Sequence, residues 1–248
     1  MEDLDRERLI DGCAAQMLRT LAAFGLQWDG AIEYQSACTP TYATALQRLR
    51  ALELTFECSC SRRELAYAGG YPGTCRAGPQ SAGPTATRFR VPPGTLSFAD
   101  RVQGHCAFDL AERGDVIIRR RDDAFAYQLA VVVDDARQGV TDVVRGADLL
   151  DSTPWQISLQ RALELPTPRY AHLPLITEPS GAKLAKSRRS VALEPADAGP
   201  QLWQALSLLR QDPPAELKLQ SPVQILSWGI EHWTLEPLHN LRQMPLRP

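Results

Sequence analysis

Three cysteines and a tyrosine crowd into one short segment whose residue types suit metal binding. Residues 58–75 read CSCSRRELAYAGGYPGTC, a C-x-C-x10-Y-x3-C pattern that contains Cys58, Cys60, Tyr71 and Cys75. Zinc takes four ligands in a tetrahedron, mostly thiolate and imidazole, so three thiolates leave one position for the phenol or for water. A redox pair, or unpaired thiols in a glycine-rich loop, remains an open alternative.

Composition and the N-terminal sequence narrow these alternatives. The chain has 248 residues, of which 44% are hydrophobic and 23% are charged, an ordinary mixture for a soluble globular protein. The N-terminal residues MEDLDRERLIDG lack the basic-then-apolar order of a signal peptide, and no apolar run is long enough to span a membrane. We therefore expect a cytoplasmic protein with reduced cysteines, in which Cys13, Cys38 and Cys106 are small buried hydrophobic residues.

Basic residues at two other places suit the binding of anions. Lys183 and Lys186 lie in the segment KLAKS, and lysine suits phosphate as a mobile point charge. Arg145 lies in VVRGADLL, and arginine is the natural bidentate partner of a carboxylate. The alternatives are a solvated basic loop for the lysines and a structural ion pair with Asp142 or Asp148 for the arginine.

Hydrophobic periodicity predicts helices and strands that interleave along the chain, which indicates an α/β fold. Helices are expected in 9–24, 40–53, about 152–163, QLWQALSLLR and SPVQILSWGI. Strands are expected in RFRVPP, TLSFADRV, CAFDL, DVIIRR, VTDVV and HLPLIT. Within FAYQLAVVVDD, the short valine-rich run LAVVV favours a buried strand, with a helix packed onto a sheet as the alternative.

Four pieces of sequence, together with the cysteine segment, carry a family resemblance. EDLD, FAYQLAVVVDD, VVRGADLL and KLAKS occur in this order. Together they resemble the catalytic core of the class I glutamyl-tRNA synthetases and, more closely, their short paralogues, the glutamyl-Q tRNA(Asp) synthetase family. The resemblance covers nearly the whole chain. It implies activation of L-glutamate by ATP, with Mg²⁺, and transfer of the glutamate to queuosine in the anticodon of tRNA(Asp). We expect a monomer.

The resemblance also implies roles for individual residues. KLAKS matches the KMSKS-type loop, so Lys186 is expected to contact an ATP phosphate with Lys183 assisting. Glu2, Tyr127 and Arg145 match positions that bind the substrate glutamate, and Glu2 is expected to pair with its ammonium group. Without the family, Tyr127 would be read as core packing. The cysteine segment matches a zinc-binding insertion, which implies one structural zinc held by Cys58, Cys60, Tyr71 and Cys75.

The resemblance further predicts how the chain is divided. Residues 1–165 are expected to form a Rossmann-like catalytic core with the zinc-binding insertion at about 55–112. The family's first β-α unit, which carries a HIGH-like signature, is expected to be missing from this core. Residues 166–248 are expected to hold the lysine loop and a small helical region, too short for the long anticodon-binding domain of a glutamyl-tRNA synthetase. The alternatives are a catalytic fragment of such a synthetase and a non-catalytic, zinc-containing RNA-binding remnant.

Overall fold

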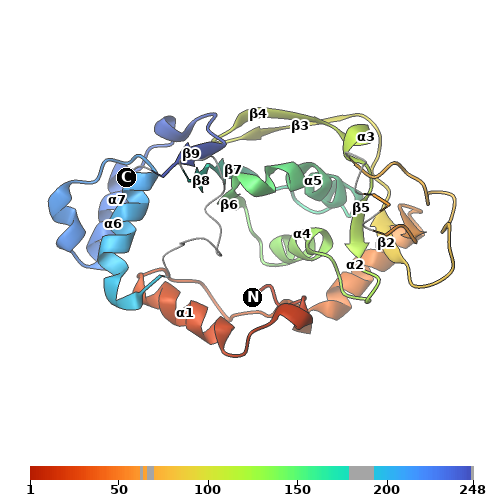
Figure 1. Cartoon of the computed structure of the whole chain (residues 1–248), viewed down its shortest axis with the longest axis horizontal. Helices are drawn as coiled ribbons and strands as arrows, with labels where there is room; N and C mark the ends of the chain where they lie inside the picture. Colours follow the sequence, from red (N-terminus) through yellow and green to blue (C-terminus); the bar gives the residue numbers. More distant parts are fainter. Residues whose placement is uncertain (62–63, 66–69, 179–192, 247–248) are drawn as a thin grey trace.

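Helices and short strands are interleaved along the chain, as the periodicity predicts (Figure 1). This computed structural model describes residues 1–61, 64–65, 70–178 and 193–246. The α-helices are α1 (Cys13–Ala23), α2 (Thr39–Ala51), α3 (Leu110–Arg113), α4 (Tyr127–Arg137), α5 (Thr153–Ala162), α6 (Ala198–Leu208) and α7 (Pro222–His232). The strands are β1 (Thr55–Cys58), β2 (Ala86–Phe89), β3 (Thr95–Asp100), β4 (Gly104–Asp109), β5 (Val116–Arg119), β6 (Asp142–Gly146), β7 (Arg169–Leu173), β8 (Leu175–Thr177) and β9 (Gln243–Pro245).

The largest sheet among the described residues has four strands. Its strand order is β4-β3-β7-β6, in which β7 is parallel to both β3 and β6, and β4 is antiparallel to β3. Parallel strands need a crossover connection, and α5 supplies the one between β6 and β7. The β6–β7 register places Arg145 opposite His172. The main hydrophobic core includes buried residues of α2, α4 and α5, among them Leu49, Leu129 and Ile157.

A second sheet, β1-β2-β5, is antiparallel and carries the cysteine segment at one end of the molecule, opposite the end that holds α6 and α7 (Figure 1). Cys58 is the last residue of β1 and lies opposite Ala86 of β2. Phe56, Cys58, Tyr71 and Cys75 form a hydrophobic cluster of their own, distinct from the main core. The cysteine segment therefore has a small core that is separate from that of the central sheet.

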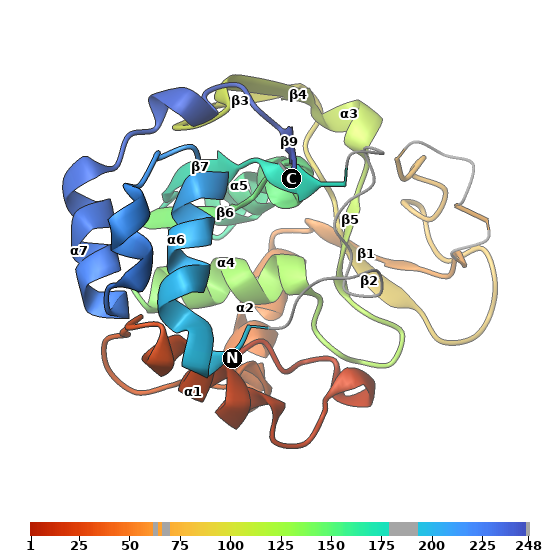
Figure 2. The ribbon, with the colours of Figure 1, turned by 60° about the vertical axis from the view of Figure 1, so that its left-hand side comes forward.

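The C-terminal helices return to the central sheet through a third, two-stranded sheet. β9 pairs with β8 in parallel, and Leu238 and Met244 pack against Val102 and Ala171 in a further buried cluster. The turned view shows α6 and α7 side by side, with α1 near the start of α6 (Figure 2). Ser221 caps α7 in a capping box with Gln224, as the sequence predicts for its N-terminus.

Two sequence predictions are wrong or wrong in part. The run LAVVV is not a strand but the middle of α4, because Leu129, Val132 and Val133 recur at helical spacing and face the main core. Of the scattered cysteines, Cys106 is buried as expected, whereas Cys38 is half-buried and Cys13 is exposed at the start of α1. Within the described ranges, no helix combines the length and apolarity needed to cross a membrane.

Candidate active site and metal centre

Arg145 lies in β6, and hydrogen bonds hold its guanidinium plane from two nitrogens. Its Nε donates to Nε2 of His172 at 3.0 Å. Its Nη2 donates to Oγ1 of Thr153 and to Oε1 of Gln156, each at 2.8 Å, and to the carbonyl of Leu149 at 3.4 Å. Because these acceptors lie on β7, α5 and the turn before α5, the βαβ unit itself sets the direction of the guanidinium.

A buried acid lies behind the histidine that accepts from Arg145. Oδ2 of Asp100 is 2.6 Å from Nδ1 of His172, and neither side chain is exposed to solvent. Oδ1 of Asp100 accepts from the backbone N–H groups of Val102, Gln103 and His172 at 2.9, 2.8 and 3.1 Å. Both carboxylate oxygens are thus hydrogen-bonded, and the acid is tied into β3, the turn after it and β7.

Tyr127 and Asp135 of α4 lie within electrostatic range of the same guanidinium. Burial raises the pKa of Tyr127, a hydrogen bond from Arg145 and its positive charge lower it, and the charge of Glu2 raises it. Burial also raises the pKa of Asp135 to about 6, against the lowering effect of Arg145 and with a further raising contribution from Glu2. The four residues are therefore within electrostatic reach of one another. The group offers a cation for a carboxylate and two anions for an ammonium ion.

The N-terminal segment that carries Glu2 is attached to the rest of the chain. The Met1 ammonium donates to the carbonyl of Glu33 at 2.6 Å, and the Met1 carbonyl accepts from the amide of Gln35 at 3.0 Å. Asp3 accepts from the amide and hydroxyl of Ser36 at 2.8 and 2.5 Å. These bonds flank Glu2 on both sides, so its exposed carboxylate is held near α4 and is not at a frayed chain end.

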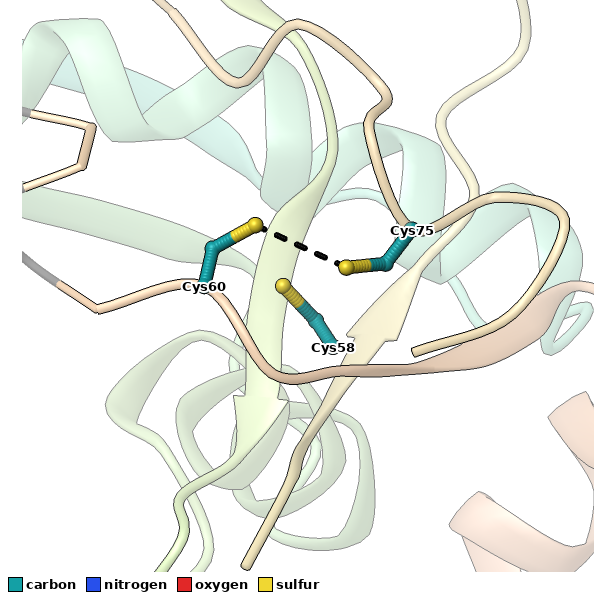
Figure 3. A group of neighbouring side chains, drawn as sticks. All are labelled: Cys58, Cys60 and Cys75. Atoms are coloured by element: carbon teal, nitrogen blue, oxygen red, sulfur yellow. Dashed lines mark hydrogen bonds between the residues drawn. The ribbon is translucent and has the colours of Figure 1, made fainter. Parts of the chain in front are cut away.

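The three thiols of residues 58–75 converge on one point. Figure 3 shows the sulfurs of Cys58, Cys60 and Cys75 directed toward one another, and all three lie within 4.8 Å. Cys60 Sγ and Cys75 Sγ are 3.5 Å apart, close to the spacing of about 3.8 Å that zinc–sulfur bonds of about 2.3 Å give in a tetrahedron. The hydroxyl of Tyr71 is 3.5 Å from Cys58 Sγ. The donor set fits one tetrahedral metal ion.

Hydrogen bonding favours negative charge in this thiol cluster. Burial acts to raise the pKa of the Cys75 thiol, but hydrogen bonds from the backbone of Ser59, from Tyr71 and from Cys60 outweigh it and lower the pKa to about 6. Burial and the neighbouring thiols raise the pKa of Cys60 to about 11. The cluster therefore holds a thiolate at Cys75 near neutral pH, which is the ligand form that a metal needs.

Close packing fastens the cysteine segment to the start of β5. Arg76 donates from Nε and Nη2 to the buried carboxylate of Asp115, each at 2.7 Å. Arg88 lies over the Tyr71 ring at 3.9 Å and donates to the Asp115 carbonyl at 2.7 Å. Gly114 approaches Tyr71 so closely that a Cβ there would lie 2.2 Å from the Tyr71 carbonyl oxygen. Tyr71 is thus fixed by its neighbours as well as by the thiols.

The structure brings together most of the residues that the sequence singled out. Glu2, Tyr127 and Arg145 form one electrostatic group, and the four metal-ligand candidates form another. The third expectation, for Lys183 and Lys186, falls on residues outside those that the structure describes.

Sequence reasoning missed three polar residues of the site. The sequence patterns place Asp100 and His172 only in expected strands, and Asp135 only at the end of FAYQLAVVVDD. The available signal was an ionisable residue inside a strand expected to be buried, since such a group needs a partner. The pattern could not name that partner, because Asp100 and His172 are 72 positions apart.

Comparisons with known proteins identify relatives of this chain. Residues 72–198 match the family model described as tRNA synthetases class I (E and Q), catalytic domain. A protein of Ectopseudomonas mendocina named glutamyl-Q tRNA(Asp) synthetase is 53% identical over 94% of this chain and 80% of its own length. The protein of the same name from Pseudomonas aeruginosa PAO1 is 48% identical over 99% of this chain and 84% of its own length.

Solved structures show the same fold at low sequence identity. The glutamate-tRNA synthetase of Elizabethkingia anophelis superposes with a TM-score of 0.79 at 19% identity, covering 99% of this chain and 60% of that one. A glutamate tRNA ligase of Elizabethkingia meningosepticum, solved in complex with its amino acid, gives 0.78 at 18% identity, with 100% and 59% covered. This chain therefore spans about three fifths of the length of those two structures.

Proposed function

The chain belongs to the class I tRNA synthetases for glutamate and glutamine, within the glutamyl-Q tRNA(Asp) synthetase family, and on this premise we propose that it activates L-glutamate with ATP and transfers it to queuosine in tRNA(Asp). Its fold is the class I tRNA synthetase fold, and it is a ligase of the aminoacyl-tRNA synthetase type. The observation that carries the proposal is the assembly of Arg145 with Tyr127 and Glu2 beside the central sheet.

In the proposed amino-acid site, the charges of the protein complement those of glutamate. The Arg145 guanidinium binds a substrate carboxylate, and the Tyr127 hydroxyl lies beside it. Glu2, with Asp135, supplies the negative charge for the ammonium group. Because Arg145 already has its plane fixed by Thr153 and the side chains around it, little reorganisation is needed when the substrate arrives.

The proposed reaction is a displacement at phosphorus. A carboxylate oxygen of glutamate attacks the α-phosphorus of ATP, a new P–O bond forms, and the bond to the bridging oxygen breaks so that pyrophosphate leaves, with Mg²⁺ bound to the phosphates. Positioning and charge stabilisation are the main contributions of the protein to such a step. Lys186, assisted by Lys183, is proposed to contact the ATP phosphate. A hydroxyl of queuosine then attacks the activated carbonyl and AMP leaves.

The thiol cluster is proposed to hold a structural zinc through Cys58, Cys60, Tyr71 and Cys75. When bound, the zinc holds the segment in place and takes no part in adenylation.

A cavity of about 750 Å³ lies beside Tyr71 and is lined by Arg88, Arg113 and Trp155. Arginine and aromatic side chains suit phosphate and base contacts, so we assign the RNA approach to this side.

We also propose a division of the chain. Residues 1–165 form the core, about 55–112 form its zinc-containing insertion, and 166–248 form the C-terminal region.

The test measures the two half-reactions separately. Glutamate-dependent ATP–pyrophosphate exchange without tRNA is expected, because glutamate and ATP are proposed to meet at one site of this chain. Transfer of labelled glutamate is expected to tRNA(Asp) that contains queuosine and not to a queuosine-free tRNA(Asp) transcript. Charging of a tRNA(Glu) transcript instead would identify a glutamyl-tRNA synthetase fragment. A folded, zinc-loaded protein without exchange or transfer would identify a non-catalytic RNA-binding protein.

A further inference from the structure

We propose that Asp100 and His172 act as a positioning pair for Arg145, in which the acid holds the imidazole in the Nδ1–H tautomer so that Nε2 accepts the Nε–H of the arginine. The proposal rests on the proposed function to the extent that Arg145 is the residue that binds the glutamate carboxylate. Neither Asp100 nor His172 contacts the substrate in this scheme, and both act through the guanidinium.

The direction of each hydrogen bond follows from which groups can donate. Arginine has only donors, so its Nε, 3.0 Å from His172 Nε2, requires a lone pair on that nitrogen. A neutral imidazole with an unprotonated Nε2 carries its proton on Nδ1, and Nδ1 is 2.6 Å from Oδ2 of Asp100. An imidazolium would place a second N–H against the Arg145 Nε–H. The geometry therefore selects the tautomer with its proton on Nδ1, in which Nε2 also accepts from the Thr153 hydroxyl 3.1 Å away.

The surroundings keep Asp100 ionised and so keep that tautomer in place. Burial acts to raise the pKa of Asp100, but hydrogen bonds from the His172 side chain and from the backbone N–H groups of Gln103 and Val102 outweigh it and lower the pKa. An ionised carboxylate has only acceptors, so it requires the proton on Nδ1. The polarity is thus transmitted from the backbone of the β3–β4 turn, through His172, to Arg145.

The pair also determines which edge of the guanidinium a substrate can use. The edge formed by Nε and Nη2 is the fork that usually grips a carboxylate with two parallel bonds. Here His172 occupies Nε, while Thr153 and Gln156 occupy Nη2. The substrate carboxylate is therefore expected to meet the edge that includes Nη1. If the proton of His172 moved from Nδ1 to Nε2, the hydrogen bond from Arg145 Nε would be lost. The guanidinium would then turn away from this orientation.

The first experiment reads the tautomer directly, without any substrate. In protein labelled with ¹⁵N-histidine, the His172 signals are expected to show Nδ1 protonated and Nε2 unprotonated. The isosteric change Asp100→Asn keeps an oxygen for the backbone donors but places an amide N–H against Nδ1, so the proton is expected to move to Nε2 and the hydrogen-bonded Arg145 Nε–H resonance to disappear. A proton on Nε2 in the unchanged protein would overturn the proposal.

The second experiment uses paired substitutions that each keep half of the imidazole. In His172→Gln the amide oxygen reaches the place of Nε2 and still accepts from Arg145, whereas in His172→Asn the amide reaches only Nδ1 and still donates to Asp100. Glutamate affinity would be measured by calorimetric titration. Asp100→Asn and His172→Asn are expected to weaken glutamate binding about 10-fold or more, because each loses one charge-assisted hydrogen bond. ATP binding is expected to be unchanged. His172→Gln is expected to bind glutamate more tightly than His172→Asn.

The controls separate this role from a merely structural one and from failure of the proposed function. Asp142→Asn is the same isosteric change on β6, at an acid that pairs with Arg169, and is expected to leave glutamate affinity unchanged. Equal glutamate affinity for Asp100→Asn and the unchanged protein would overturn the proposal. If the unchanged protein binds no glutamate, the proposed function fails, while the tautomer and Arg145 resonances still decide for or against the positioning pair.

Discussion

The guanidinium of Arg145 is engaged by acceptors of three different chemical types, an imidazole, a hydroxyl and an amide. Nε donates to His172, and Nη2 donates to Thr153 and Gln156, which in turn donates to Gln128. Such a network rigidifies a site only if every member is satisfied, because an unpaired polar group in a poorly solvated place is costly. At the scale of single residues, we therefore expect the proposed binding of glutamate to depend on groups that do not contact it.

Replacing Arg145 by lysine tests this dependence. A lysine keeps the charge but offers one ammonium group in place of a planar fork, so it cannot bond His172, Thr153 and Gln156 together and still face a substrate. We expect Arg145→Lys to reduce glutamate-dependent exchange about 100-fold, the equivalent of roughly 3 kcal/mol, with ATP affinity unchanged. Arg169→Lys, at an exposed ion pair with Asp142, is the matched control. Unchanged exchange by Arg145→Lys would remove the arginine from the glutamate site.

Asp135 gives the site a dependence on pH that stability measurements can read. Its pKa in the folded protein is raised to about 6, whereas an unfolded aspartate titrates near 3.9. The folded state therefore binds more protons than the unfolded state between these values, so this residue lowers the free energy of unfolding as pH rises from about 4 to about 6.

We expect Asp135→Asn to remove that pH-dependent loss. The quantity to compare is the melting temperature of Asp135→Asn minus that of the unchanged protein. This difference should be larger, in favour of the variant, at pH 7.5 than at pH 4.5. The exposed Asp29, changed to Asn, serves as the control and should show the same small difference at both values. A difference for Asp135→Asn that stays constant or shrinks as pH rises would contradict the assigned shift.

At the scale of elements, the local sequence pattern predicts where a helix or strand lies better than it predicts which of the two it is. The helices expected at about 152–163 and in SPVQILSWGI are observed as α5 and α7, each with a proline in its first turn, and Ser221 caps α7. LAVVV could not be assigned in the same way, since valine favours strands and a short apolar run has no clear period. Packing of α4 between α2 and α5 overrides that preference, and it is this packing that presents Tyr127 and Asp135 to Arg145.

Two glycines with positive φ test how closely the cysteine segment is fastened to β5. Gly114 has φ of +67° with ψ of −175°, a region essentially restricted to glycine, and Gly139 has φ of +69°, so alanine is strained at both positions. Only at Gly114 does a new Cβ meet backbone, the carbonyl and amide of Tyr71 at 2.2 and 2.5 Å, while at Gly139 nothing lies within 4 Å. Gly139→Ala is therefore the control for a positive φ without a steric contact, and zinc content is the measurement that reports displacement of a proposed ligand.

We therefore expect Gly114→Ala to lose zinc and Gly139→Ala to retain it. Zinc content per chain would be measured after dialysis, beside the melting temperature of each variant. Cys75→Ser provides the reference for loss of a ligand. If Gly114→Ala keeps its zinc at the level of Gly139→Ala, the contact between Tyr71 and β5 is not what places the tyrosine near the thiols.

At the scale of the whole molecule, the thiol cluster and the elements of the proposed amino-acid site pack in different hydrophobic clusters. Tyr71 and Cys75 pack with Phe56, while α4 and α5 pack in the main core around Leu129. The sequence could predict each group of residues, because each has a local motif. It could not predict the joints between them, such as Arg76 with Asp115, which are 39 positions apart and carry no pattern of their own.

This separation predicts that metal and amino acid stabilise different parts of the protein. A ligand that binds only the folded state stabilises it by RT ln(1 + [L]/Kd), about 2.7 kcal/mol at 100 times its dissociation constant, and the gain falls on the unit that contains the site. Glutamate is therefore expected to raise the temperature at which the main core unfolds. Zinc is expected to raise the temperature at which the cysteine segment unfolds. Scanning calorimetry with each ligand alone and with both would resolve the two.

Hydrogen exchange locates the two effects along the chain, because the amides of each unit report their own opening. Removal of zinc by a chelator should lose protection in β1 and near Cys75 while α4 and β6 keep theirs, and glutamate affinity should be unchanged. Cys75→Ser should reproduce that pattern without a chelator, which excludes an effect of the chelator on Mg²⁺. Loss of protection in α4 on zinc removal would mean instead that Arg76 and Asp115 couple the two clusters into one cooperative unit.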